Sequence, residues 1–229
     1  MHNDDFSQEN IRRTAFFTGH RVLPSRDVPL VRSGLCRCLQ AAYEAGYRRF
    51  FCGCALGFDT LAAFETIRLR ETCPDVILSL AIPCADQSDR WNTKDKEVYS
   101  RLLDEADDRK VLFPAYRQGV MQTRNRYMAD RSSLCICYLT HMRGGTASTV
   151  RYAVHNRIPV INLAMPGAAS DYSILRENTW NCTFTFRSAG KNAVIAPLSL
   201  MRTRKLNMKT ISGLSSMKPD SGTRKPTNP

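Results

Sequence analysis

Three glycine-containing loops carry the residues of this sequence that could bind an anion. The loops read Thr-Gly-His-Arg over 18–21, Gly-Cys-Ala-Leu-Gly-Phe-Asp over 53–59 and Arg-Gly-Gly-Thr over 143–146. Each follows a short apolar run typical of a buried strand. Glycine lets a ligand approach the backbone, and the free N–H groups at the start of a helix suit a phosphate. The sequence therefore predicts a phosphate site formed by loops.

Each loop also has a structural interpretation that needs no ligand. The first reads equally as a tight turn in which His20 and Arg21 are solvated. Asp59 could stabilise a helix start by about 0.3–1 kcal/mol, or it could contact a ligand or act in catalysis. Hydroxyl groups at 146, 148 and 149 are typical helix caps. Because two such loops precede helices, we favour phosphate binding over capping alone.

A fourth element reads Arg124-Asn125-Arg126 and lies on a predicted helix before an apolar run. Residues i and i+2 of a helix point about 200° apart, so they do not share a face. We therefore expect at most one of the two arginines to reach a given ligand.

The residues that position these loops alternate between strand and helix patterns. Strands are predicted over 14–18, 49–52, 76–82, 110–113, 134–139 and 159–163, with Pro83 and Pro114 stopping the third and fourth. Helices are predicted from about 31 to a stop at Gly46, and over 58–71, 91–105, 120–130 and 146–155.

This alternation predicts an α/β fold, a Rossmann-like and mostly parallel sheet with helices on both faces. Ligands of such sheets bind beyond the carboxyl ends of the strands. The three glycine loops can share one ligand only if their strand ends adjoin. We therefore predict the strand order 4-3-2-1-5-6.

Composition divides the chain into a domain over 12–166 and a basic extension over 167–229. The chain has 33 basic and 21 acidic side chains, a net charge of +12. The extension contributes +7 of this charge, lacks apolar periodicity, and should be poorly ordered at least over 199–229. A basic tail attracts nucleic acid without specificity, or it serves only as a solubilising extension.

The N-terminus and the apolar runs of the sequence indicate where the protein is located. The N-terminus has no basic and apolar leader, and no apolar run could span a membrane, so we expect a cytoplasmic protein.

The chain has nine cysteines, and an odd count without an export signal argues against a disulfide framework. Cys135 and Cys137 share a strand face and should be reduced and buried. Cys36 and Cys38 point apart on a helix, and we expect no metal site.

Taken together, the four elements resemble the SLOG superfamily, named for the Smf/DprA and LOG proteins, and most closely its YpsA-like family of bacterial proteins. The resemblance covers residues 14–165 and includes Gln87 with Trp91. The Arg-Asn-Arg element before a strand and a Gly-rich loop also resembles the core of the DNA-uptake protein DprA. The resemblance implies a Rossmann-like sheet that binds nucleotide-derived small molecules.

One position departs from the pattern of the LOG branch, and it concerns whether this chain could hydrolyse a nucleotide. The LOG branch, which cleaves cytokinin-type nucleotides, carries Pro-Gly-Gly-x-Gly-Thr-x-x-Glu, and Thr149 stands here in place of that Glu. A glycosidic hydrolase needs a carboxylate, so its absence counts against this reaction, although Asp59 or Asp130 could substitute.

We therefore expect a binding or sensing module for a phosphate-bearing nucleotide ligand such as ADP-ribose or NAD, with no other cofactor assigned. The alternatives are a nucleotide hydrolase or N-glycosidase with Asp59 as the candidate catalytic residue, and DprA-like binding of single-stranded DNA. The small charge of +5 outside the extension and the scarcity of aromatics in the loops weigh against DNA. A homo-oligomer remains open. The predicted ligand-binding residues are Gly19, His20, Arg21, Gly53, Cys54, Ala55, Gly57, Asp59, Arg124, Asn125, Gly144, Gly145 and Thr146.

Overall fold

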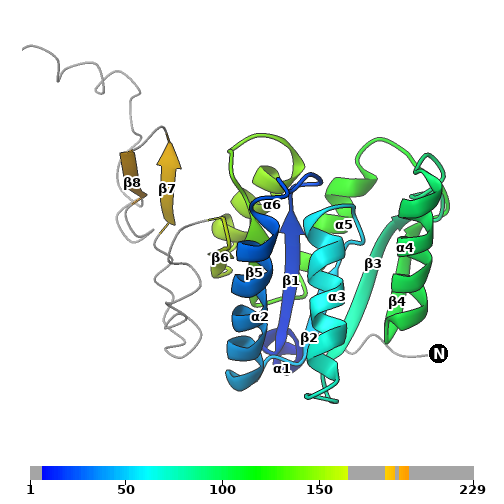
Figure 1. The fold of residues 1–229 in the computed structure, drawn as a ribbon, viewed down its shortest axis with the longest axis horizontal. Helices are drawn as coiled ribbons and strands as arrows, with labels where there is room; N and C mark the ends of the chain where they lie inside the picture. Colours follow the sequence, from blue (N-terminus) through cyan, green and yellow to red (C-terminus); the bar gives the residue numbers. More distant parts are fainter. Residues whose placement is uncertain (1–6, 165–183, 189–190, 196–229) are drawn as a thin grey trace, which may run out of the picture. The chain divides into compact units, whose positions relative to one another are not determined.

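The computed structural model describes residues 7–164, 184–188 and 191–195. Six parallel strands form one sheet in the order β4-β3-β2-β1-β5-β6 (Figure 1). They are β1 (Thr14–Gly19), β2 (Arg49–Cys52), β3 (Ile77–Cys84), β4 (Asp108–Phe113), β5 (Leu134–Tyr138) and β6 (Val160–Asn162). The predicted order is confirmed. The chain steps outward from β1 to β4 and then returns to place β5 against β1, which creates a topological switch point between them.

Helices cover both faces of this sheet. They are α1 (Gln8–Arg12), α2 (Val28–Glu44), α3 (Phe58–Arg70), α4 (Thr93–Glu105), α5 (Val120–Ala129) and α6 (Gly144–His155). One apolar cluster joins α2, α3 and α4 to one face, and a second joins α5 and α6 to the other. Gly46 has φ +97° just after α2, which confirms it as the helix stop.

Strand β1 shows why the central strands are continuously apolar. Phe16 packs into the α5–α6 cluster, whereas its neighbour Phe17 packs into the other. The Phe17 ring stacks on Phe50 at 6.0 Å and meets Phe58 edge-on at 6.5 Å. Each of these rings is fully buried, and burial of one such side chain stabilises the fold by about 1.5–3 kcal/mol. The packing fixes β1 at the centre, where its end meets the candidate site.

Some boundaries differ from prediction. The expectation that the third strand stops at Pro83 is wrong, because β3 continues to Cys84. The pairing of β3 with β2 ends at Leu80, whereas its pairing with β4 continues to Cys84. Pro83 therefore lies in an edge-like part of the strand, where proline is tolerated. Pro114 does follow the end of β4.

Two further strands, β7 (Phe184–Ser188) and β8 (Lys191–Ile195), form an antiparallel ladder. The sequence analysis predicted no strand there. The predicted lack of order over 199–229 lies outside the described residues.

The cysteines are placed as expected. Cys135 and Cys137 are free and fully buried on β5. On α2, Cys38 is buried and Cys36 is exposed, so the two side chains point apart. Within the described ranges, no three His, Cys, Asp or Glu side chains gather in a way that could hold a metal ion. Over the same ranges, no helix is long and apolar enough to cross a membrane.

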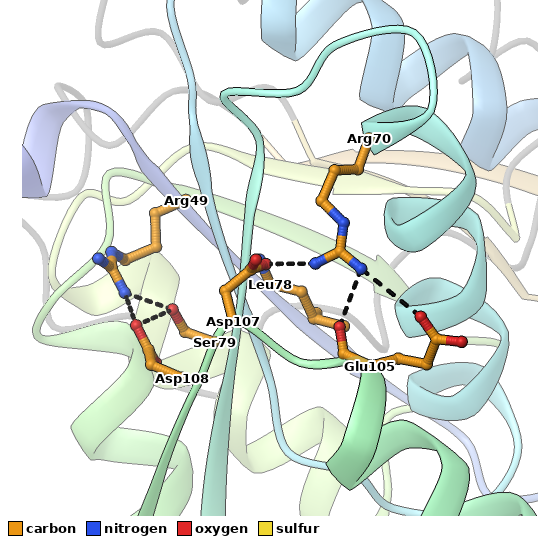
Figure 2. Close-up of polar contacts among 7 residues, drawn as sticks. All are labelled: Arg49, Arg70, Leu78, Ser79, Glu105, Asp107 and Asp108. Atoms are coloured by element: carbon orange, nitrogen blue, oxygen red, sulfur yellow. Dashed lines mark hydrogen bonds and ion pairs between the residues drawn. The ribbon is translucent and has the colours of Figure 1, made fainter.

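Polar side chains tie the outer strands together at their amino ends. Figure 2 shows Arg49 on β2 bridging Ser79 of β3 and Asp108 of β4. Beside them, Asp107 accepts hydrogen bonds from the Leu78 N–H at 2.8 Å and from Arg70 Nη1 at 2.7 Å. These contacts lie at the opposite end of the strands from the glycine loops, so their role is to hold the sheet edge.

We expect Asp107→Ala to lower the free energy of unfolding by about 1–2 kcal/mol, because it leaves the Leu78 N–H without its acceptor and removes one of the acceptors of Arg70. Urea denaturation measures this change. Asp104→Ala on exposed α4 is the matched control and should stay within about 0.5 kcal/mol of wild type. Equal losses in both variants would show that the network does not stabilise the fold.

Candidate functional site

The three glycine loops meet at the carboxyl edge of the sheet, because β2, β1 and β5 are neighbours. The Thr146 hydroxyl at the start of α6 donates to the Gly19 carbonyl at 2.8 Å. The Phe58 N–H donates to the His20 carbonyl at 3.1 Å, and the His20 N–H donates to the Tyr138 carbonyl at 3.2 Å. Direct hydrogen bonds therefore join the first loop to both of the others.

Two glycines are needed for the loops to approach each other. A Cβ on Gly53 would overlap the guanidinium of Arg124. Gly57 has φ +83°, a left-handed conformation that disfavours other residues, and a Cβ there would overlap the Arg21 carbonyl. Next to Gly53, Cys54 also has a positive φ of 51°. The second loop is thus a tight, specified turn.

Arg124 is the principal charged group at this edge. It reaches from α5 over Gly53 and is 5% exposed. Its Nε and Nη1 atoms are buried and have no hydrogen-bond partner among the described residues. The Asp59 carboxylate lies 3.9 Å from Nη1, too far for a hydrogen bond. Buried donors without acceptors are unfavourable, so this guanidinium is arranged to receive one.

Asp59 lies in the first turn of α3 and is 4% exposed. Its Oδ2 accepts a hydrogen bond from the Ala55 N–H at 3.4 Å. Burial raises the pKa of this carboxyl to about 6, although Arg124 opposes the shift. Asp59 therefore combines a local role in the loop with the pKa of an acid–base group.

The loop after β3 adds acceptors that were not among the predicted ligand-binding residues. Gln87 Nε2 donates to the Cys54 carbonyl at 2.8 Å, and its Oε1 is buried with no hydrogen-bond partner among the described residues. Asp86 accepts from the Tyr116 N–H at 3.0 Å through Oδ2, while its buried Oδ1 has no such partner there. Gln87 figured in the family resemblance. Asp86 was missed, although a carboxylate directly after a strand could have indicated it.

His20 and Arg21 differ in their surroundings. His20 Nε2 accepts a hydrogen bond from the Thr140 N–H at 3.0 Å, and its ring stacks on His141 at 4.2 Å. Burial, together with His141, lowers the pKa of His20. His20 thus serves as a neutral acceptor within the loops, while Arg21 is exposed.

The start of α6 is open. The helix has no side-chain cap, and a Cβ added to Gly144 or Gly145 would meet nothing within 4 Å beyond its chain neighbours. The hydroxyls do not cap: Thr146 bonds to Gly19, and Thr149 bonds to the Gly145 carbonyl at 2.9 Å. The first N–H groups of α6 are therefore without side-chain acceptors in this part of the structure, which suits an anion.

The two arginines of the Arg-Asn-Arg element point to different surroundings, as predicted. Arg124 is buried against the loops, whereas Arg126 is exposed. Asn125 Nδ2 donates to the Thr149 hydroxyl at 2.6 Å, which links α5 to α6. Asn125 thus connects the two helices.

Trp91, which figured in the family resemblance, meets Tyr99 edge-on at 5.3 Å and packs against the core, so its role is structural.

A comparison with protein families defines the class of this protein. The YpsA model, described as the YspA SLOG family, matches residues 24–157, more than half of the chain. The chain therefore belongs to this SLOG family, as the loop residues predicted.

Curated bacterial relatives show partial matches. The SPbeta prophage-derived protein YoqJ of Bacillus subtilis is 29% identical over 117 residues, which cover 46% of this chain and 68% of YoqJ. A UPF0398 protein of Halalkalibacterium halodurans is 24% identical over 109 residues, covering 47% of this chain and 58% of the relative. One of Bacillus pumilus is 31% identical over 104 residues, covering 44% and 56%. The chain thus matches less than two thirds of the length of either UPF0398 protein.

Two solved structures of DNA processing protein A (DprA) are similar to this chain. The Streptococcus pneumoniae protein has a TM-score of 0.49 at 16% identity, covering 72% of this chain and 56% of that one. The Helicobacter pylori protein, described as binding single-stranded DNA, has a TM-score of 0.45 at 20% identity, covering 69% and 67%. Both scores fall below 0.5, so the family assignment rests on the family model.

Proposed function

We propose that this SLOG domain binds or senses a phosphate-bearing, nucleotide-derived ligand of the ADP-ribose or NAD type. The ligand would lie at the carboxyl edge of the sheet, against the loops after β1, β2 and β5. The observation that carries the proposal is the buried guanidinium of Arg124, whose Nε and Nη1 donors have no hydrogen-bond acceptor among the described residues. A phosphate oxygen would supply that acceptor through a charge-assisted hydrogen bond.

The open start of α6 supports the same site. Its N–H groups are free of side-chain caps, and a Cβ on Gly144 or Gly145 would meet nothing within 4 Å apart from its chain neighbours and the backbone of its own helix. A helix start contributes roughly half a positive charge to a nearby anion. Together with Arg124, it would hold two adjoining phosphates from two sides.

Acceptors at the end of β3 support a ligand with hydroxyl groups. Asp86 Oδ1 and Gln87 Oε1 are both buried and without hydrogen-bond partners among the described residues. Phosphates cannot donate to them, but sugar hydroxyls can. The phosphates of a nucleotide would accept from Arg124 and the start of α6, and its ribose hydroxyls would donate to Asp86 and Gln87. This combination favours a nucleotide-derived ligand over a free phosphate.

A second candidate function is hydrolysis of an N-glycosidic bond. One observation favours it: burial raises the pKa of Asp59 to about 6, near the value suited to a general acid or base. The position that carries Glu in LOG proteins is Thr149, whose hydroxyl bonds to the Gly145 carbonyl. Asp59, or Asp130, whose Oδ1 accepts from the Tyr152 hydroxyl, would therefore have to supply the carboxylate, and turnover of a nucleotide panel decides this alternative.

Single-stranded DNA is the third candidate ligand. The net charge of +12 gives any polyanion an attraction that salt weakens. A gel shift with oligonucleotides at increasing salt tests it. Binding that persists at physiological salt, and that nucleotides do not displace, would favour DNA over the proposed ligand.

Calorimetric titration of the wild-type chain and Gly145→Val with ADP-ribose, NAD and mononucleotides tests the proposal. Gly145 has no positive φ and open space around its Cβ position, so valine should fit the fold. The new side chain would occupy the phosphate's place, and we expect a loss of at least about tenfold in affinity. If no nucleotide binds, or if one binds both proteins equally, the proposed site is wrong.

A further inference from the structure

A pocket of about 280 Å³ lies between α5 and α6 and meets the loop site at Asn125 and Gly145. Both helices contribute hydrogen-bonding side chains to it. Its lining residues are Gln122, Asn125, Arg126, Gly145, Ser148, Thr149, Arg151, Tyr152 and His155. Two arginines and a histidine are present and no carboxylate is, so the pocket favours an anion.

The cations of this pocket have little engagement with protein acceptors. Arg126 lies 5.5 Å from the centre of the Tyr152 ring, and no hydrogen bond or ion pair occupies its guanidinium among the described residues. Arg151 donates one hydrogen bond, of 3.3 Å, to the Met142 carbonyl. The Tyr152 hydroxyl donates to Asp130, which neutralises neither arginine. Two guanidinium groups thus face one pocket with most of their donors available.

This pocket adjoins the loop site, with which it shares Asn125 and Gly145, but its two arginines do not belong to that site. Arg124 and Arg126 stand two residues apart on α5, the first buried against Gly53 and the second exposed. Between them, the Asn125 side chain donates to the Thr149 hydroxyl at 2.6 Å, and both residues line the pocket. A ligand held by Arg126 therefore contacts an arginine that the loop site does not use.

The geometry points to a second anion site here, in which Arg126 and Arg151 bind the phosphoryl group of a small phosphate ester or of free phosphate. The volume is slightly below that of ordinary ligand pockets, about 300–1,000 Å³, so a sugar phosphate fits better than a dinucleotide. Tyr152 offers an apolar ring surface beside the arginines, suited to a sugar face. This inference rests on Arg126 and Arg151, which lie outside the proposed loop site, so variants of these two residues test it apart from that site.

The test uses the full chain, inorganic phosphate as the probe, and proton NMR of the histidine rings. The chain has four histidines. His155 lines the pocket, whereas His20 and His141 lie beside the glycine loops. A His155→Gln variant assigns the His155 signal. At constant pH and ionic strength, phosphate should shift the His155 signal to saturation.

Arg126→Ala and Arg151→Ala should each raise the phosphate concentration at half saturation by about tenfold, because each removes a charge-assisted hydrogen bond. Arg12→Ala, which removes the same charge from exposed α1, should leave it unchanged. A His155 signal that never saturates, or that saturates equally in all three variants, would overturn the proposal, since net charge alone would then explain it.

Two further measurements distinguish binding at the loop site from binding in the pocket and identify the source of the phosphoryl group. Signals of His20 and His141 that respond to Arg124→Ala but not to Arg126→Ala report the loop site, so either site can fail while the other stands. Oligothymidylate with and without a 5′-phosphate identifies the source of the phosphoryl group. A response to the unphosphorylated strand, with none to inorganic phosphate, would overturn the proposal in favour of a phosphodiester chain.

Discussion

Arg124→Ala should lower the affinity for ADP-ribose by about tenfold to a hundredfold, the effect of losing a charge-assisted hydrogen bond worth roughly 1.5–3 kcal/mol. The guanidinium is buried over Gly53, and two of its donors have no acceptor among the described residues. A phosphate that meets these donors gains from a site already desolvated and fixed in place. Calorimetry with ADP-ribose measures the change.

Two variants guard this experiment against a loss of folding. Gly53→Ala keeps the arginine but places a Cβ where its guanidinium lies, so it should also weaken binding. Arg101→Ala on exposed α4 removes the same charge elsewhere and should bind as wild type does. If Arg124→Ala retains both a cooperative unfolding transition and wild-type affinity, Arg124 does not contact the ligand.

The affinity for ADP-ribose should rise as the pH falls from about 8 to about 5.5. Asp59 lies 3.9 Å from Arg124, and its pKa is raised to about 6 by burial. The ionised carboxylate repels a phosphate and offsets part of the Arg124 charge, so protonation of Asp59 favours phosphate binding. Uptake of one proton limits the gain to about tenfold per pH unit above the pKa.

Asp59→Asn separates this effect from other titrations. The variant should bind tightly at both pH values and lose most of the pH dependence. ADP-ribose is the suitable probe, because the charge of its pyrophosphate is constant over this range. A wild-type affinity that does not change with pH, or an Asp59→Asn variant that retains the same slope, would show that the carboxylate does not face the ligand.

The raised pKa also has a consequence for stability. Asp59 titrates near 6 in the folded chain and near 3.8 when unfolded, so the folded state binds more protons between these values. Stability therefore falls as the pH rises through this window, by roughly 3 kcal/mol for a shift of this size. The contribution is absent in Asp59→Asn, so the difference between the two unfolding curves across this window isolates it.

The sheet could be predicted because its signals are local. Continuous apolar runs such as that of β1 are typical of strands buried on both faces, and Phe16 and Phe17 do occupy opposite clusters. Strand order followed from a functional requirement, that three glycine loops must adjoin, and it is confirmed. The end of β3 was misjudged at Pro83, since proline disrupts a strand only where a neighbouring strand needs the N–H that proline lacks.

The site could be predicted only in outline. Spacing indicated that Arg124 and Arg126 face different ways, but it could not decide which one is buried against Gly53. The unpartnered oxygens of Asp86 and Gln87 depend on tertiary contacts with other loops, which no local pattern encodes. The hydroxyls of α6 looked like caps, yet Thr146 reaches across to the Gly19 carbonyl. Such long-range bonds follow from strand adjacency rather than from sequence neighbours.

The most direct test of the ligand site is a titration of the isotopically labelled chain with ADP-ribose, followed by backbone amide NMR. A phosphate held by Arg124 over the second loop and by the open start of α6 should shift the amide signals of residues 53–59 and 144–146 most strongly, together with the side-chain signals of Arg124. All of these shifts should saturate at one ligand concentration. Shifts confined to other parts of the chain, or no saturable shift at any amide of these two loops, would contradict the site proposed here.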